Sequence, residues 1–228
     1  QLQDGFEQCF AQSGIQRFFI GIGNHDIKDC DILNTQFNYD NPLWNFPALY
    51  YNVVYNLHSY KINFIVMDTN MFDYENESEP AKDCQGKDFT VKQKDAQKAW
   101  ISQQISEVQA KYNVIVGHIP YYANGHKAEK HPVYKSELAD FIRKMNPDLY
   151  ICADEHNQQI IKDPECNTTI VVCGSGGTEL DPFAKDTKAI DGTLRAKSDF
   201  GFVLLHFTPN LYSIDFVDNE EKARRGWQ

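Results

Sequence analysis

The chain alternates short apolar runs with polar segments, in the way that is typical of strands separated by loops. Runs at 17–23, 50–56 and 63–68 are rich in aromatic and β-branched residues, which favour strands. Later in the chain, apolar runs that begin near residues 113, 148 and 168 have the same character. The stretch 201–218 predicts a hairpin, because two such runs flank a Pro-Asn pair.

Two segments have apolar residues at helical spacing instead. Residues 91–112 and 135–145 predict amphipathic helices, and the second ends before Pro147. The first apolar stripe consists of Ala96, Trp100, Ile101, Ile105, Val108 and Tyr112, and the second of Leu138, Phe141, Ile142 and Met145. Since helices alternate with strands and strands close the chain, we expect one α/β domain with layered sheets over residues 1–228.

Polar clusters follow three of the predicted strands, as Asn24-His25-Asp26, as Gly117-His118, and as residues 154–157. Ligands of open α/β sheets bind beyond the carboxyl ends of strands, so we expect these clusters to converge. Asn and Asp oxygens and His nitrogens suit Zn, Fe or Mn, and the pattern therefore predicts a metal site. The alternative for any single His is a surface residue, and we interpret His58 and His206 in this way.

Composition narrows the classes of partner. The formal charge of −10 disfavours nucleic acid or an anionic membrane surface as the main partner. No apolar run approaches the ~20 residues of a membrane helix. The six cysteines form no Cys-x-x-Cys pair, which excludes a zinc-ribbon or thioredoxin-like motif and leaves disulfides open. Together with sequons at Asn76 and Asn167, the cysteines favour a secreted or lumenal glycoprotein.

The motifs "GNHD", "GHIP" and "EHN" resemble those of the calcineurin-like metallophosphoesterases. With "LWNFPALYY", "FIVMDTN", "AWISQQI" and "VVCGSGG", the chain is most similar to the small, tartrate-resistant purple acid phosphatases. The resemblance implies a four-layer α/β/β/α sandwich with two metal ions, Fe with Fe, Zn or Mn. It also implies hydrolysis of phosphate monoesters by a metal-activated hydroxide.

The resemblance also implies roles for individual residues. Asn24 and His118 would bind the second metal, and His156 the first. His25 would be the general acid at the leaving group, because imidazole titrates in a useful range. Asp26 would orient His25 through a hydrogen bond.

Other positions match the family less closely. His126 falls near a family histidine that contacts substrate, after a gap of one residue. Asp154 stands where the family has a metal-binding His, and Glu155 where it has Asp; the Asp154 carboxylate would favour Mg or Mn more than His would. No early Asp-x-His or Gly-Asp motif precedes Gly23, so we expect the chain to be the C-terminal two-thirds or so of the family's domain, without its first strands.

Two functions follow from these observations. The intact "GNHD" and "GHIP" motifs favour an acid phosphatase that acts on a phosphate ester, completed by an N-terminal segment or a larger complex. Without the bridging carboxylate of the early motifs, two cations would repel each other strongly. The alternative is therefore a catalytically degenerate scaffold or membrane-complex anchor, like the glideosome-associated anchor of apicomplexan parasites.

Overall fold

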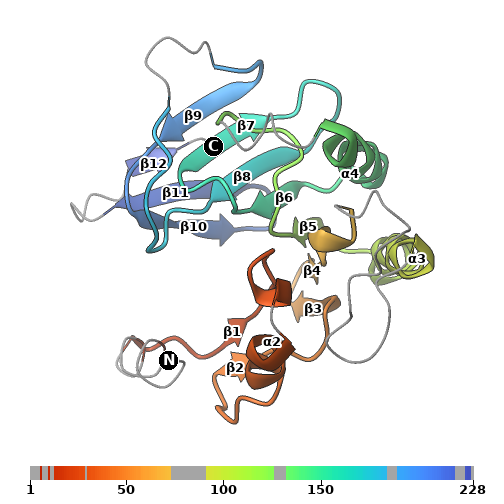
Figure 1. Cartoon of the computed structure of the whole chain (residues 1–228). Coiled ribbons are helices and arrows are strands. Elements are labelled where there is room, and N and C mark those ends of the chain that lie inside the picture. Colours follow the sequence, from red (N-terminus) through yellow and green to blue (C-terminus); the bar gives the residue numbers. More distant parts are fainter. Residues whose placement is uncertain are drawn as a thin grey trace.

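A seven-stranded mixed sheet is the centre of the molecule (Figure 1). The computed structural model describes residues 6, 10, 13–28, 30–72, 91–125, 132–183, 189–218 and 224–226. The strand order is β3-β4-β5-β6-β8-β7-β9. The bounds are β3 Tyr51–Asn56, β4 Lys61–Val66, β5 Tyr112–Val116, β6 Leu149–Cys152, β7 Gln158–Lys162, β8 Thr169–Cys173 and β9 Thr193–Lys197. Because β4, β5, β6 and β8 pair in parallel, their carboxyl ends meet at one edge of the sheet.

Helices cover one face of this sheet and a smaller sheet covers the other (Figure 1). The helices are α3 Val91–Val108 and α4 Pro132–Met145, and the smaller sheet contains β10 Gly201–Phe207, β11 Tyr212–Asp218 and β12 Arg224–Gly226. Ile101 of α3 and Leu138 of α4 are fully buried against Ile115 of β5. Each such side chain stabilises the fold by about 1.5–3 kcal/mol.

A third unit precedes the large sheet and leads into the polar cluster at Asn24. It contains β1 Phe18–Phe19, β2 Trp44–Asn45, the short helix η2 Asp26–Lys28 and α2 Cys30–Phe37. β1 pairs in parallel with β2, and Ile22 and Leu33 are buried in the core of this unit. It therefore has a small core of its own, beside β3 (Figure 1).

The predicted α/β class and the predicted helices are confirmed, with three of the four expected layers present in the described ranges. Two details of the prediction were wrong. Tyr112 begins β5 instead of ending the first helix, which stops at Val108, and the run 17–23 forms only the two-residue strand β1. The sequence pattern also missed β7 and β9, whose residues do not form an apolar run.

The four cysteines within the described ranges are free thiols: Cys30, Cys152, Cys166 and Cys173. Burial raises the pKa of the Cys173 thiol to about 11, so this thiol is protonated at neutral pH. The sequon at Asn76 lies outside the described residues.

Candidate metal centre

Three of the predicted ligands converge at the carboxyl edge of the large sheet. The Nε2 atom of His118 lies 3.2 Å from Oδ1 of Asn24 and 3.5 Å from Oδ1 of Asp154. His118 follows β5, Asp154 follows β6, and Asn24 follows β1. The side chains of His118 and Asp154 are 22% and 19% exposed, so solvent reaches the cluster. We call these three residues the Asn24 cluster.

Two glycines allow this close approach. A Cβ atom on Gly117 would lie 2.6 Å from Cγ2 of Thr69 and 2.8 Å from the hydroxyl of Tyr150. A Cβ atom on Gly23 would lie 3.0 Å from the ring of His118. The His118 backbone N–H donates to Oγ1 of Thr69 at 3.2 Å, which fixes the backbone of this residue.

Asp154 has a backbone φ of 59°, in the left-handed region. Asp adopts this region more readily than most residues other than Gly, since its short polar side chain can form local hydrogen bonds. The unusual backbone conformation turns the chain sharply between β6 and β7.

A buried carboxylate, Asp68, follows β4 at the same edge of the sheet. One of its oxygens accepts hydrogen bonds from the backbone N–H and the side-chain amide of Asn70, both at 2.9 Å. The other, Oδ2, has no hydrogen-bond partner within the described ranges. Burial raises the pKa of the Asp68 carboxyl to about 7, although the Asn70 hydrogen bonds and the charge of His118 act in the opposite direction. Sequence reasoning missed this group, although it directly follows an apolar run.

The proposed acid His25 is exposed, whereas its neighbour Asp26 is half-buried. The Asp26 carboxylate accepts a hydrogen bond from the Gly23 backbone N–H at 2.7 Å and another from the Gln36 amide at 2.7 Å. These contacts fix the loop that carries Asn24 to α2. A hydrogen bond between His25 and the Asp26 carboxylate is not found in the described part of the chain, and that role stays a prediction.

His156 has partners outside the Asn24 cluster. Its backbone N–H donates to the Asp181 carboxylate at 2.9 Å, and its Nδ1 lies 2.8 Å from the Glu179 carbonyl oxygen. No hydrogen bond or ion pair joins it to the Asn24 cluster among the residues described, so its metal role stays a prediction. His126 lies outside the described residues.

The chemistry of the Asn24 cluster fits one divalent cation. It offers an imidazole nitrogen, an amide oxygen and a carboxylate oxygen, and this mixed set suits Zn, Mn or Fe. No group of three or more His, Cys, Asp or Glu side chains placed to hold a metal is found within the described ranges. The Asn24 cluster therefore supplies part of the predicted second metal site, and donors for the first predicted metal do not gather among those residues.

Comparisons with known proteins agree with this fold. The family model "Calcineurin-like phosphoesterase" matches residues 2–158, more than half of the chain. No curated protein matches the chain significantly.

Solved structures share the fold. In "GAP50 the anchor in the inner membrane complex of Plasmodium", the similarity covers 97% of this chain and 69% of that one, at 20% identity and a TM-score of 0.76. In the purple acid phosphatase PPD1 of yellow lupin (Lupinus luteus) seeds, it covers 93% of this chain and only 37% of that one, at 16% identity and a TM-score of 0.62. On the match to the family model, this chain belongs to the calcineurin-like phosphoesterase family.

Proposed function

We propose that the protein is a metal-dependent phosphomonoesterase of the purple acid phosphatase type. The observation that carries the proposal is the convergence of side chains from three separate loops. The side-chain oxygens of Asn24 and Asp154 lie 3.2 and 3.5 Å from Nε2 of His118. Membership of a phosphoesterase family supports the reaction class. The solvent access of the Asn24 cluster supports entry of a phosphate ester.

The residues of the chain have distinct tasks in this proposal. The Asn24 cluster holds a cation, which supplies charge to polarise a phosphate ester and to acidify water when it is bound. His25 is exposed next to Asn24 and donates a proton to the leaving oxygen. Asp26 holds the loop through the Gly23 N–H and Gln36, so that Asn24 keeps its position relative to His118.

The environment we propose for this enzyme is the secretory pathway. Asn167 lies in a sequon with Thr169 and is exposed between β7 and β8. A glycan on this side chain would extend into solvent without disturbing the sheet, which supports glycosylation at this position.

A second candidate function is a non-catalytic scaffold. Two observations favour it, because each takes a predicted ligand out of the metal site. Asp154 stands where the family has a metal-binding His, and the ring of His156 forms a hydrogen bond with the carbonyl oxygen of Glu179. GAP50, whose fold this chain shares, is described as an anchor in a membrane complex, so the partner would be another protein of such a complex. Within the described ranges, no helix has both the length and the apolar character needed to cross a membrane.

Turnover of p-nitrophenyl phosphate separates the two candidates. The chain is purified after chelation and assayed with Mn²⁺, Zn²⁺, Fe²⁺ or Mg²⁺. We expect metal-dependent turnover that falls at least about 100-fold in His118→Ala. Loss of a residue that hydrogen-bonds to a metal ligand typically lowers activity about 10–100-fold, and loss of the ligand itself lowers it more. The matched control is His58→Ala, at an exposed position away from the Asn24 cluster, which keeps full activity. Absence of metal-dependent turnover, or equal turnover in His118→Ala, would leave the scaffold as the better account.

A further inference from the structure

A short polar segment after β4 contacts both of the loops that carry Asn24 and His118. It consists of Asp68, Thr69 and Asn70, and we call it the 68–70 segment; the short helix η3 Thr69–Phe72 begins within it. The side chains of all three residues are buried. Because buried polar groups are almost always hydrogen-bonded, the partners of this segment indicate what it holds in place.

Thr69 holds the loop that carries His118. Its Oγ1 accepts hydrogen bonds from the backbone N–H groups of His118 at 3.2 Å and of Ile119 at 3.1 Å. The carbonyl oxygen of His118 in turn accepts a hydrogen bond from the Ala153 N–H at 2.8 Å, directly before Asp154. One hydroxyl therefore fixes the backbone from which the His118 ring extends, and this backbone is joined to the loop of Asp154.

Asn70 contacts the loop that carries Asn24. Its Nδ2 donates to Oδ1 of Asp68 at 2.9 Å, and a longer contact of 3.5 Å joins the same Nδ2 to the Gly23 carbonyl oxygen, next to Asn24. The ring of His118 packs on the same glycine, since a Cβ atom there would lie 3.0 Å from its Cε1. The two loops therefore meet at Gly23, beside the 68–70 segment.

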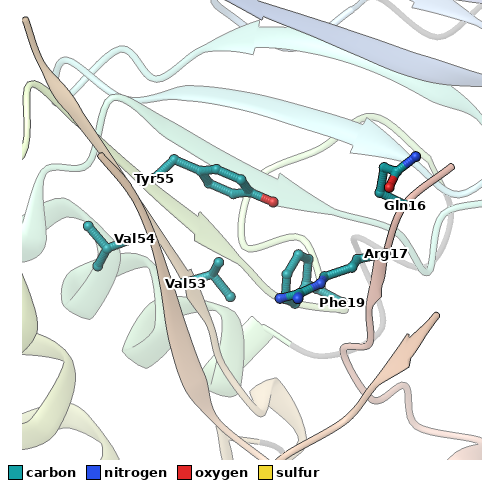
Figure 2. A pocket seen from close by; sticks show the side chains of 6 residues that line it. All are labelled: Gln16, Arg17, Phe19, Val53, Val54 and Tyr55. Carbon is teal, nitrogen blue, oxygen red and sulfur yellow. The ribbon is translucent and has the colours of Figure 1, made fainter. Parts of the chain in front are cut away.

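The segment that leads to Asn24 is separated from β3 at its start. A cavity of about 450 Å³ lies between β3 and residues 16–19 (Figure 2). Beyond the cavity, the hydroxyl of Tyr51 in β3 donates to the Ile20 carbonyl oxygen at 2.9 Å. The contact of Asn70 is nearer to Asn24 than this one, so it has the more direct effect on the position of the Asn24 side chain.

Helix α3 anchors the 68–70 segment. The side-chain amide of Gln97 is fully buried, and its Oε1 accepts a hydrogen bond from the Asp68 N–H at 2.8 Å. Its Nε2 donates to the Asp68 carbonyl oxygen at 3.0 Å. Both backbone groups of Asp68 are thus paired with one side chain of a long helix, which gives the segment a fixed position relative to the large sheet.

We propose that Thr69 and Asn70 are positioning residues that set the separation between Asn24 and His118, with Gln97 as their anchor. The inference rests on the proposed function, because this separation matters for a cation that the two side chains hold. Neither positioning residue touches the cation in this proposal. Residues that hold metal ligands in place typically change metal affinity about 10–100-fold when they are lost.

Three variants test whether the Thr69 hydroxyl acts on the Asn24 cluster. Thr69→Val has nearly the same shape and lacks the hydroxyl, whereas Thr69→Ser keeps it. The matched control is Thr168→Val, which removes another fully buried hydroxyl. That hydroxyl donates to the Pro147 carbonyl oxygen at 2.8 Å, at the amino end of β8 and away from the Asn24 cluster.

Two measurements follow the variants. In the chelated chain, an NOE between the Gly23 Hα protons and Hε1 of the His118 ring reports the contact between the two loops. We expect this NOE to be lost in Thr69→Val and kept in Thr69→Ser and Thr168→Val. In calorimetry with Zn²⁺, Thr69→Val should bind about tenfold more weakly than the wild type, and the other two variants as tightly as the wild type.

Asn70→Ala keeps the hydrogen bonds of Thr69 and decides the question if Thr69→Val does not fold; we expect it to lose the NOE too. An NOE that persists in both variants would overturn the proposal. Equal loss in Thr69→Ser or Thr168→Val would also overturn it, as would equal Zn²⁺ affinity in Thr69→Val and a wild type that binds the ion. The expected NOE pattern in a wild type that binds no Zn²⁺ would support the positioning role and contradict the proposed function, so the two fail separately.

Discussion

Replacing Asp68 with Asn tests how much the buried Asp68 carboxyl changes the free energy of unfolding with pH. Asp68 is fully buried, and burial raises the pKa of its carboxyl from 3.8 to about 7. Asn has nearly the same shape, and its amide oxygen can still accept the two hydrogen bonds that Asn70 donates. The substitution therefore removes the ionisable group and keeps the acceptor.

The magnitude follows from linkage between protonation and folding. Because the pKa of Asp68 is higher in the folded state, the folded chain binds this proton more tightly between about pH 4 and pH 7. The stability that the protonated group contributes is complete below about pH 4 and is lost as the pH rises through 7. A pKa rise from 3.8 to about 7 corresponds to a loss on the order of 4 kcal/mol at pH 8.

Urea unfolding in EDTA at pH 4 to 8 measures this loss. We expect Asp68→Asn to match the wild type near pH 4 and to exceed its free energy of unfolding at pH 8 by up to about 4 kcal/mol. The matched control, Asp140→Asn on the exposed face of α4, removes a carboxylate that is not buried. Equal pH dependence in Asp68→Asn and the wild type would refute the reasoning.

Three further predictions concern single positions. Gly117→Ala places a Cβ atom 2.6 Å from Thr69 and lowers the free energy of unfolding by about 1–3 kcal/mol, and an unchanged melting temperature would contradict the close contact. Asp154→His restores the family's ligand and raises Zn²⁺ affinity roughly tenfold by calorimetry, whereas unchanged affinity would remove Asp154 from the site. Asn167→Gln lowers the mass of the protein secreted from eukaryotic cells by one N-glycan, and an identical mass would exclude glycosylation there.

The local pattern of apolar residues predicted those strands and helices that are stabilised by burial of apolar side chains. The runs that became β4, β5, β6 and β8 are apolar because both faces of these strands are covered. β7 was missed because Gln158 and Gln159 begin it, and these buried amides are held by contacts that a sequence pattern does not contain, such as Gln158 with Ser175. The first helix was predicted to extend to residue 112 because Tyr112 continues the helical spacing of its apolar residues. In the structure, Tyr112 belongs to β5 and packs between the two sheets.

The candidate site was predicted only in part. The meeting of His118 and Asp154 follows from the rule that parallel strands end at one edge, because β5 and β6 are parallel neighbours. Asn24 reaches them from β1, which lies in a separate two-stranded sheet, so that rule does not account for its position. The position of His156 depends on the turn at Asp154 and on a carbonyl supplied by Glu179, far along the chain. Such long-range contacts are fixed by packing and are not encoded in the spacing of a motif.

The central claim is that the Asn24 cluster binds a cation, and anomalous diffraction from crystals grown with Mn²⁺ or Zn²⁺ tests it most directly. We predict an anomalous peak in contact with Oδ1 of Asn24, Nε2 of His118 and the Asp154 carboxylate. The same crystals of His118→Ala should lose that peak. A wild-type map without a peak at these atoms, at a metal concentration that saturates the crystals, would contradict the account.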